Sequence, residues 1–332
     1  MPDYFLVAVS TRRNLELCIE YSHAGFPSTS TGPWPFEDIS PGDQLSFLYG
    51  ARVRNIYEVV SKAAYTEPER LPPSWEPIYF RGISRYGGKE GAVAPYFPFR
   101  LFLRQIGEFD EPIIRSEFAY FAEGLLWRGG YGKSHFQGDE LSRQNVLRLA
   151  HPVSASEKPR LELSAPSFTP RYSRSRERLE GVFKFDEKLL QAAIRHHLKR
   201  NRESMYSLLD LIGLSDWRNR ELEVLGERAI ARGSPDLIIK ERCLEGPSRE
   251  VVGEVKLNSA KVEDINQLAS YLDEVGDRAA SGFIVSSSFP KAVMSELSRY
   301  PKIHPLIYEH ADFGDRGLSF EEIVASMKLV GR

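Results

Sequence analysis

The chain has 332 residues, which is enough for about two domains of roughly 150 residues each. Hydrophobic residues make up 42% and charged residues 27%, a composition that excludes a fibrous protein and excludes disorder for most of the chain. The formal net charge is −2, so a nucleic-acid-binding surface would have to come from local clusters of Lys and Arg.

The sequence also favours one cellular compartment. It contains no apolar run of about 18 residues, so we expect no transmembrane helix. Its start, MPDYFLVAVSTRR, has an acidic residue before the apolar stretch and no small-residue cleavage site, so we expect no signal peptide. Cys18 and Cys243 are far apart and form no disulfide or metal-binding pattern. These features predict a protein of the reducing cytoplasm with no membrane partner.

Residues 1–150 are rich in aromatic residues and glycine. Runs with strand character follow one another, separated by turn signals such as SPGD and YGGKEG. Strands are expected at 4–10, 43–50, 55–65 and 99–106. Several strands within about 150 residues predict a small β-barrel or a curved sheet with a few helices.

Residues 151–181 are rich in Pro, Ser and Arg and have little apolar periodicity. This composition predicts a linker between two domains. The alternative, a surface loop of one larger domain, is less favoured because loops of this length are uncommon in compact domains.

Residues 182–332 alternate between helical and strand patterns. Apolar spacing predicts helices at 185–201, 203–212, 262–276 and 291–300. Strands are expected at 220–230, 235–241, 250–257, 281–288 and 304–310. Asp186 suits the N-cap of the first helix, and Gly276 suits the end of the third. The order predicts an α/β sandwich with a mixed sheet, so the fold class of the chain is α/β (α+β overall).

Three charged residues at the ends of neighbouring strand segments form the sharpest pattern. Asp236 begins one strand, and Glu254-Val255-Lys256 ends the next. Residues two apart in a strand share a face, so Glu254 and Lys256 point the same way. If the strands are neighbours, Asp236 lies beside Glu254, and two carboxylates can hold a hard cation such as Mg²⁺. Lys256 could then orient or deprotonate an attacking water and balance charge on phosphate.

An ordinary structural explanation competes with this one, because Glu–Lys pairs usually mark a solvated face. The following helix carries Gln267 and Tyr271 at i and i+4, so both lie on one helical face and could reach a nucleic-acid backbone. Glu187 begins the first helix and could supply a third carboxylate. It could equally be an acid that the helix dipole favours at this position.

The segment ARGSPDLIIKE…VVGEVK…QLASY resembles the PD-(D/E)xK nuclease superfamily, including its RecB-like and NucS/EndoMS-like branches. The likeness covers most of the second half and implies a restriction-endonuclease-like domain. It implies metal binding by Asp236, Glu254 and the Val255 carbonyl, with Mg²⁺ as the cofactor and Mn²⁺ as a substitute. It also implies a catalytic Lys256. The remaining implied roles are support of the active site by Gln267 and Tyr271, and a third carboxylate from Glu187, Glu223 or Glu227. The approach GSPD is closer to the Holliday-junction resolvase pattern.

The first half resembles the PUA-like group that includes EVE and YTH domains. The resemblance rests on the opening strand DYFLVAVST, a Trp-bearing loop and a GD turn into an aromatic strand. Such domains hold one flipped, modified base in an aromatic pocket, where stacking contributes roughly 1–3 kcal/mol. Trp34 is the expected stacking residue, and Ser30 and Thr31 could read the base edge. Trp75, Tyr79 and Trp127 are weaker candidates. Packing of these Trp residues in the core is the competing explanation.

Two basic segments could contact phosphate. Lys133 lies in the Gly-rich stretch 127–140, which could cradle phosphate or be an ordinary surface loop. Arg195, Lys199 and Arg200 lie in the run RHHLKRNR on the first helix of the second half. Runs of this kind are often only solvated faces.

Together these features predict a Mg²⁺-dependent DNA endonuclease with an N-terminal base-recognition domain (1–150), a linker (151–181) and a nuclease domain (182–332). The expected role is modification-dependent restriction of duplex DNA with a modified or extruded base. The alternatives are a mismatch or branched-structure repair nuclease and a non-catalytic nucleic-acid reader. Cleavage of both strands needs two active sites, so a homodimer is expected.

Overall fold

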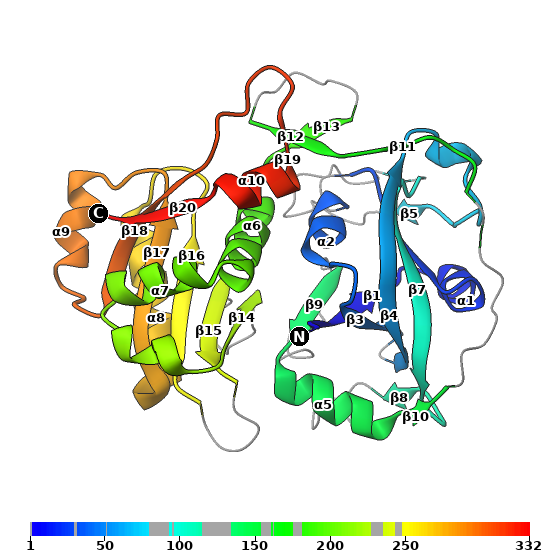
Figure 1. Cartoon of the computed structure of the whole chain (residues 1–332), viewed down its shortest axis with the longest axis horizontal. Coiled ribbons are helices and arrows are strands. Elements are labelled where there is room, and N and C mark those ends of the chain that lie inside the picture. Colours follow the sequence, from blue (N-terminus) through cyan, green and yellow to red (C-terminus); the bar gives the residue numbers. More distant parts are fainter. Residues whose placement is uncertain are drawn as a thin grey trace. The chain divides into compact units, whose positions relative to one another are not determined.

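The structure is a computed structural model that describes residues 2–29, 32–50, 52–79, 93–94, 96–114, 134–153, 161, 163–174, 181–226, 235–242 and 248–332. The chain forms two compact units (Figure 1). The first comprises Met1–Gly138 and Ser142–Lys184, and the second comprises Asp139–Leu141 and Phe185–Arg332. Both combine helices with β-sheet, in agreement with the expected α/β class.

The first unit is built on a 9-stranded mixed sheet. Six strands follow the order β10-β7-β4-β3-β1-β9, and β2, β8 and β11 pair with β7 or β4. The bounds are β1 Tyr4–Ala8, β2 His23–Phe26, β3 Gln44–Tyr49, β4 Arg52–Tyr65, β7 Phe99–Glu108, β8 Ile113–Ile114, β9 His135–Gly138, β10 His151–Pro152 and β11 Ser167–Phe168. Strands β1 and β3 are parallel, and the other described pairs are antiparallel. Within the described residues this order is open and does not close a barrel.

Helices and short strands complete the first unit. The helices are α1 Arg12–Glu20, α2 Pro33–Asp38, the single turn η1 Pro68–Arg70 and α5 Glu140–Leu149, of which Glu140 and Leu141 are counted with the second unit. The short pairs are β5 Ile78–Tyr79 with β6 Val93–Ala94, and β12 Arg171–Ser173 with β13 Val182–Lys184. Strands β10, β11 and β12 lie within 151–181, so part of the segment expected as a linker contributes sheet to this unit.

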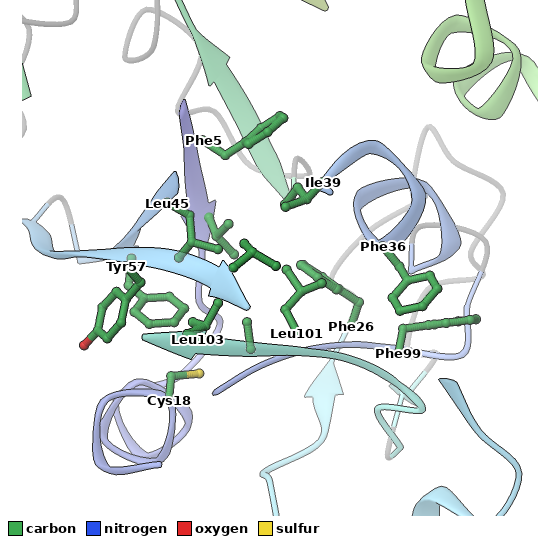
Figure 2. Close-up of a cluster of buried hydrophobic side chains, with 14 of the residues drawn as sticks. Phe5, Cys18, Phe26, Phe36, Ile39, Leu45, Tyr57, Phe99, Leu101 and Leu103 are labelled. Carbon is green, nitrogen blue, oxygen red and sulfur yellow. The ribbon is translucent and has the colours of Figure 1, made fainter. Parts of the chain in front are cut away.

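The core of the first unit fills the space between the sheet and its helices. Figure 2 shows Phe5, Leu45 and Leu101 converging from three strands, with Phe36 of α2 against Phe99. Alternation along β7 explains this, because Phe99, Leu101 and Leu103 share one face of the strand. Arg100 and Arg104 lie on the other face.

The second unit is a 6-stranded mixed sheet in the order β14-β15-β16-β17-β18-β20. The strands are β14 Leu222–Gly226, β15 Leu237–Glu241, β16 Glu250–Val255, β17 Ala279–Ser286, β18 Ile303–Glu309 and β20 Lys328–Gly331. The small strand β19 Leu318–Ser319 precedes the last helix. Pairs β14–β15, β15–β16 and β18–β20 are antiparallel, whereas β16–β17 and β17–β18 are parallel. The mixed sheet expected from the sequence is therefore present.

The helices of the second unit are α6 Glu187–Arg200, α7 Arg202–Leu211, α8 Val262–Val275, α9 Lys291–Leu297 and α10 Phe320–Ser326, with single turns η2 Ser215–Asn219 and η3 Gly276–Arg278. Asp186 caps α6 by accepting a hydrogen bond from Leu189 N at 3.1 Å, as its sequence position predicts. Gly276, with φ of 66°, ends α8 as expected. Among the described helices, none has the length and apolar character needed to cross a bilayer.

Candidate active site

The sheet of the second unit brings two acidic side chains together. Strands β15 and β16 are antiparallel, with Leu237 opposite Gly253. Asp236 directly precedes Leu237, and Glu254 directly follows Gly253, so the same register places these two residues opposite one another. Cross-strand neighbours share a face and have Cβ atoms about 4.5–5.5 Å apart. The expected pairing of Asp236 with Glu254 is therefore a consequence of the strand register.

Lys256 lies on the same face as Glu254. Its Nζ is 2.7 Å from Glu254 Oε1 and 3.6 Å from Glu187 Oε1. Glu187 comes from the first turn of α6, which contacts β14 and β16. The geometry thus groups Asp236, Glu254, Lys256 and Glu187 at one end of β16.

Side chains hold the backbone at the end of β16. Asp236 Oδ2 accepts a hydrogen bond from Val255 N at 2.9 Å, and Glu187 Oε2 accepts one from Leu257 N at 3.2 Å. The hydroxyl of Tyr308 donates to the Leu257 carbonyl at 2.6 Å. These contacts fix the direction of the strand end that carries Glu254 and Lys256.

Burial raises the pKa of both carboxyl groups. For Asp236 burial is the main cause, and Lys256 opposes it. For Glu254 burial comes first and repulsion from Asp236 second. Burial alone would lower the pKa of Lys256, but attraction to Glu254 and Asp236 outweighs it and raises that pKa. The site therefore favours additional positive charge beside the two acids.

The chemistry of this pair fits a hard divalent cation. Glu254 Oε2 is buried and has no hydrogen-bond partner among the described residues. Carboxylate oxygens with free lone pairs are the ligands that Mg²⁺ and Mn²⁺ prefer, and Mg²⁺ usually keeps several waters. Asp236, Glu254 and the Val255 carbonyl are the groups that would hold the ion. Within the described residues, no group of three or more His, Cys, Asp or Glu side chains is arranged to hold a metal. The case for a divalent cation at this site therefore rests on the two carboxylates of Asp236 and Glu254.

Lys188 is a site residue that the sequence pattern did not indicate. It follows Glu187 in the first turn of α6. Burial lowers its pKa, and the charges of Asp236, Glu187, Asp186 and Glu254 oppose that shift. The site thus contains a second lysine side chain that interacts with the acids. A basic residue next to the expected third carboxylate was the only sequence signal for it.

Gln267 and Tyr271 lie one helical turn apart on α8, as expected. Gln267 Nε2 donates to the Tyr271 hydroxyl at 2.5 Å. Tyr271 is buried in a cluster with Val252 of β16, which lies two residues before Glu254 and therefore on the same face of the sheet. The pair consequently belongs to the side of the sheet that carries Glu254.

Glu223 and Glu227 were the alternatives to Glu187 as the third carboxylate of the site. Glu223 lies opposite Lys240, with its Oε1 3.3 Å from Lys240 Nζ, and its Oε2 accepts a hydrogen bond from Glu140 N at 2.9 Å. Lys240 is four residues beyond Asp236, which is about 13 Å along a strand. Glu223 is therefore engaged away from the acidic pair, whereas Glu227 lies outside the described residues.

The expected basic surface on α6 is smaller than the sequence suggested. Arg195 is 1% exposed and lies 3.0 Å from His196 Nε2, so it is part of the interior instead of a phosphate-binding face. Arg200 pairs with Glu321 at 2.5 Å, and Lys199 is exposed. The helical position of Arg195 did not predict its burial, because the buried face of α6 includes polar residues.

In the first unit Trp34 packs against other side chains, which was the alternative to a role in base stacking. It is 9% exposed, and its ring lies 4.4 Å from that of His135 in an edge-on contact. His135 in turn contacts Asp38 Oδ2 at 2.9 Å. The other expected residues, Ser30, Thr31, Trp127 and Lys133, lie outside the described residues.

Comparisons with known proteins give a partial likeness. No protein-family model and no curated protein matches the chain. Solved structures similar to part of it include an EndoMS–dsDNA2 complex (21% identity, TM-score 0.22) and EndoMS in apo form (21% identity, TM-score 0.19). The matches cover 31% of this chain and 42% and 44% of those chains, so the chain spans less than half of either. At these TM-scores the likeness identifies no function, and side-chain geometry has to carry the functional conclusion.

Proposed function

We propose that the second unit is a metal-dependent nuclease that hydrolyses phosphodiester bonds in DNA. The observation that carries the proposal is the juxtaposition of Asp236 and Glu254 across two strands. Lys256 Nζ lies 2.7 Å from Glu254 Oε1, and Glu254 Oε2 has no hydrogen-bond partner in the part of the chain that the structure describes. A Glu–Lys pair of a solvated face would leave its carboxylate exposed, whereas Glu254 is 1% exposed. Burying two acids side by side costs stability, and a ligand of opposite charge offsets that cost.

Each residue then has a role that follows from its position. Asp236 and Glu254 would hold a divalent cation, which when bound polarises a phosphoryl oxygen and lowers the pKa of bound water. Lys256 would place an ammonium against the negative charge that develops on the phosphate. Attraction to Glu254 and Asp236 raises its pKa in the metal-free protein, and a protonated Lys256 would stabilise charge on the phosphate. Lys188 would add a second positive charge, and Glu187 would hold the backbone at Leu257.

Base recognition by the first unit is not part of what we propose. Trp34 is packed against His135, and the other candidate base-contacting residues are not described. The arrangement of Asp236, Glu254 and Lys256 could cleave modified, mismatched or branched DNA. A cleavage assay with each of these substrates distinguishes the three possibilities.

The decisive experiment is a cleavage assay on methylated, unmethylated, mismatched and branched duplexes with Mg²⁺, Mn²⁺, Ca²⁺ or EDTA. Asp236→Asn, Glu254→Gln and Lys256→Ala should each lower the cleavage rate by at least about 100-fold, because each removes a charge that the transition state needs. Mg²⁺ and Mn²⁺ should support cutting, and Ca²⁺ should support binding with little cutting.

Matched controls separate chemistry from folding. Asp277→Asn changes an acid in η3, at the start of β17 and hence at the opposite end of the sheet from Glu254. Lys302→Ala removes an exposed lysine. Both should cut at the wild-type rate. Full cleavage in excess EDTA, or by Lys256→Ala, would contradict the proposed mechanism. Metal-independent DNA binding without cleavage would favour the non-catalytic reader.

A further inference from the structure

A second cluster of polar groups lies in the first unit, on the face of β7 that turns away from Phe99 and Leu101. Arg100 is directly opposite Gly25 of β2. Its guanidinium Cζ lies 4.4 Å from the centre of the Trp75 ring. His23, two residues before Gly25 and on the same face, has its ring 6.0 Å from that of Trp75. Three nitrogen-bearing side chains therefore meet over one patch of sheet.

The patch is built closely around these side chains. A Cβ on Gly25 would lie 1.9 Å from Trp75 Cζ3, so only glycine lets the indole lie against the strand. The loop that carries Trp75 is held by Asn14 of α1, whose Oδ1 accepts from Glu76 N at 2.8 Å and whose Nδ2 donates to the Glu76 carbonyl at 2.9 Å. The indole is thus fixed at its position.

The nitrogens of this cluster are buried and lack partners. Arg100 and His23 are each 1% exposed. Within the described part of the chain, no acceptor or donor pairs with Arg100 Nε, Arg100 Nη1, His23 Nε2 or Trp75 Nε1. A buried donor left unpaired costs roughly 1–3 kcal/mol, and a buried charge left unpaired costs more. Four such atoms in one place are therefore unlike ordinary core packing.

Among the described residues, no acidic side chain acts electrostatically on the Arg100 guanidinium. The groups that act electrostatically on Arg100 are Cys18 and Tyr65. Burial raises the pKa of the Cys18 thiol to about 12 and also raises the pKa of Tyr65, so both are neutral near pH 7. Burial and Arg100 together lower the pKa of His23 to about 3, which keeps its imidazole neutral. The cluster carries one positive charge and several unused N–H groups.

We propose that Arg100, His23 and Trp75 form a binding site for the phosphate group of a small ligand. A phosphate supplies a negative charge and several acceptor oxygens, which match a guanidinium and neighbouring N–H donors. The Trp75 ring contacts Gly25, Phe97 and Arg100, and its Nε1 is a buried donor that has no partner among the described residues. The site is independent of Asp236 and Glu254 and does not require the nuclease proposal.

Binding of inorganic phosphate to the full chain is measured in EDTA by titration calorimetry and by thermal unfolding. Chloride at the same ionic strength is the reference. Phosphate should bind and raise the Tm more than chloride does. Arg100→Met, which keeps length and apolar volume, should lower phosphate affinity at least about 10-fold. Arg104→Met is the matched control. It lies on the same face of β7, exposed and paired with Glu58 at 2.6 Å, and should bind phosphate like the wild type.

A milder variant keeps the test valid if Arg100→Met does not fold. Trp75→Phe retains a six-membered aromatic ring and removes the five-membered ring of the indole with its N–H, and it should weaken phosphate binding several-fold. Competition by a nucleoside 5′-monophosphate, compared with inorganic phosphate, distinguishes a nucleotide source from free phosphate, and either supports the site. Absence of saturable phosphate binding by the wild type, or unchanged binding by both variants, would show that the cluster holds only water and would overturn the proposal.

Discussion

At the scale of single residues, the acidic pair combines high burial with an unfavourable charge balance. Glu254 is buried beside Asp236, and Lys256 compensates only part of the repulsion. A carboxyl group whose folded-state pKa is raised adds stability that is present below its unfolded pKa. That stability is lost as the pH rises through the folded pKa. The metal-free protein should therefore lose stability as the pH rises above about 4, the unfolded pKa of a carboxyl group.

The loss of stability with rising pH leads to a prediction for Glu254→Gln, because glutamine is uncharged like the protonated acid. In EDTA the variant should have a higher Tm than the wild type at about pH 8, and the difference should shrink at about pH 5. Thermal unfolding at the two pH values measures it. Glu263→Gln, an exposed acid of α8, should leave the Tm unchanged at both. A lower Tm for Glu254→Gln at about pH 8 would show that the Lys256 contact outweighs burial and repulsion.

Sequence patterns predicted some residues of the site and missed others for physical reasons. Strand alternation and neighbouring strands were enough to predict that Asp236, Glu254 and Lys256 come together. Lys188 was missed because its place near the acids depends on how α6 docks on the sheet, which local sequence does not encode. Arg195 was expected at the surface because it lies in a basic run, yet its helical position faces the interior.

At the scale of elements, the long helices of the second unit were predicted with accurate ends, and two short elements near its C-terminal end were missed. The expected helices 185–201 and 262–276 correspond to α6 and α8, with ends within about two residues, as cap positions usually allow. Helix α10 and strand β20, of 7 and 4 residues, were not expected, whereas α9, which also has 7 residues, was predicted at 291–300. The SFEE sequence at the start of α10 was a usable signal, since Ser319 and Glu322 form a capping box.

The start of α6 connects helix stability to the candidate site. Asp186 caps the helix, and Glu187 in the next position accepts a hydrogen bond from Leu257 N. Asp186→Ala should lower the free energy of unfolding by about 1 kcal/mol and should also weaken cleavage, because the helix start that positions Glu187 would fray. Urea unfolding measures the first effect. Asp186→Ser retains a capping oxygen and should behave nearly as the wild type, and equal loss in both variants would argue against a capping role.

The close approach of β16 and β17 makes Gly253 a second sensitive position. A Cβ at Gly253 would lie 2.4 Å from Phe283 Cζ, so the phenyl ring fills the space that a side chain would need. Gly253→Ala should destabilise the protein by about 1–3 kcal/mol through overpacking. Adding Phe283→Leu should restore part of that loss in chemical denaturation. An unchanged midpoint for the single variant would mean that the ring moves aside without cost.

At the scale of the whole molecule, each chain holds one candidate site, so cutting both strands of a duplex at one position needs two chains. If the active species is a homodimer, light scattering should give twice the chain mass when DNA is bound, and supercoiled plasmid should yield linear product early. A monomer on DNA with prolonged accumulation of nicked circles would instead indicate single-strand cutting.

The antiparallel pairing of β15 with β16 has a consequence for how the protein folds. Asp236 and Glu254 belong to one hairpin, so their approach requires closing only a short loop, and short loops close quickly and at low entropic cost. The parallel partners β17 and β18 require longer crossovers through α8 and α9. The two like charges would then meet early in folding, before the rest of the sheet covers them. Folding in acid or in Mg²⁺ should on this basis be faster than folding at neutral pH in EDTA.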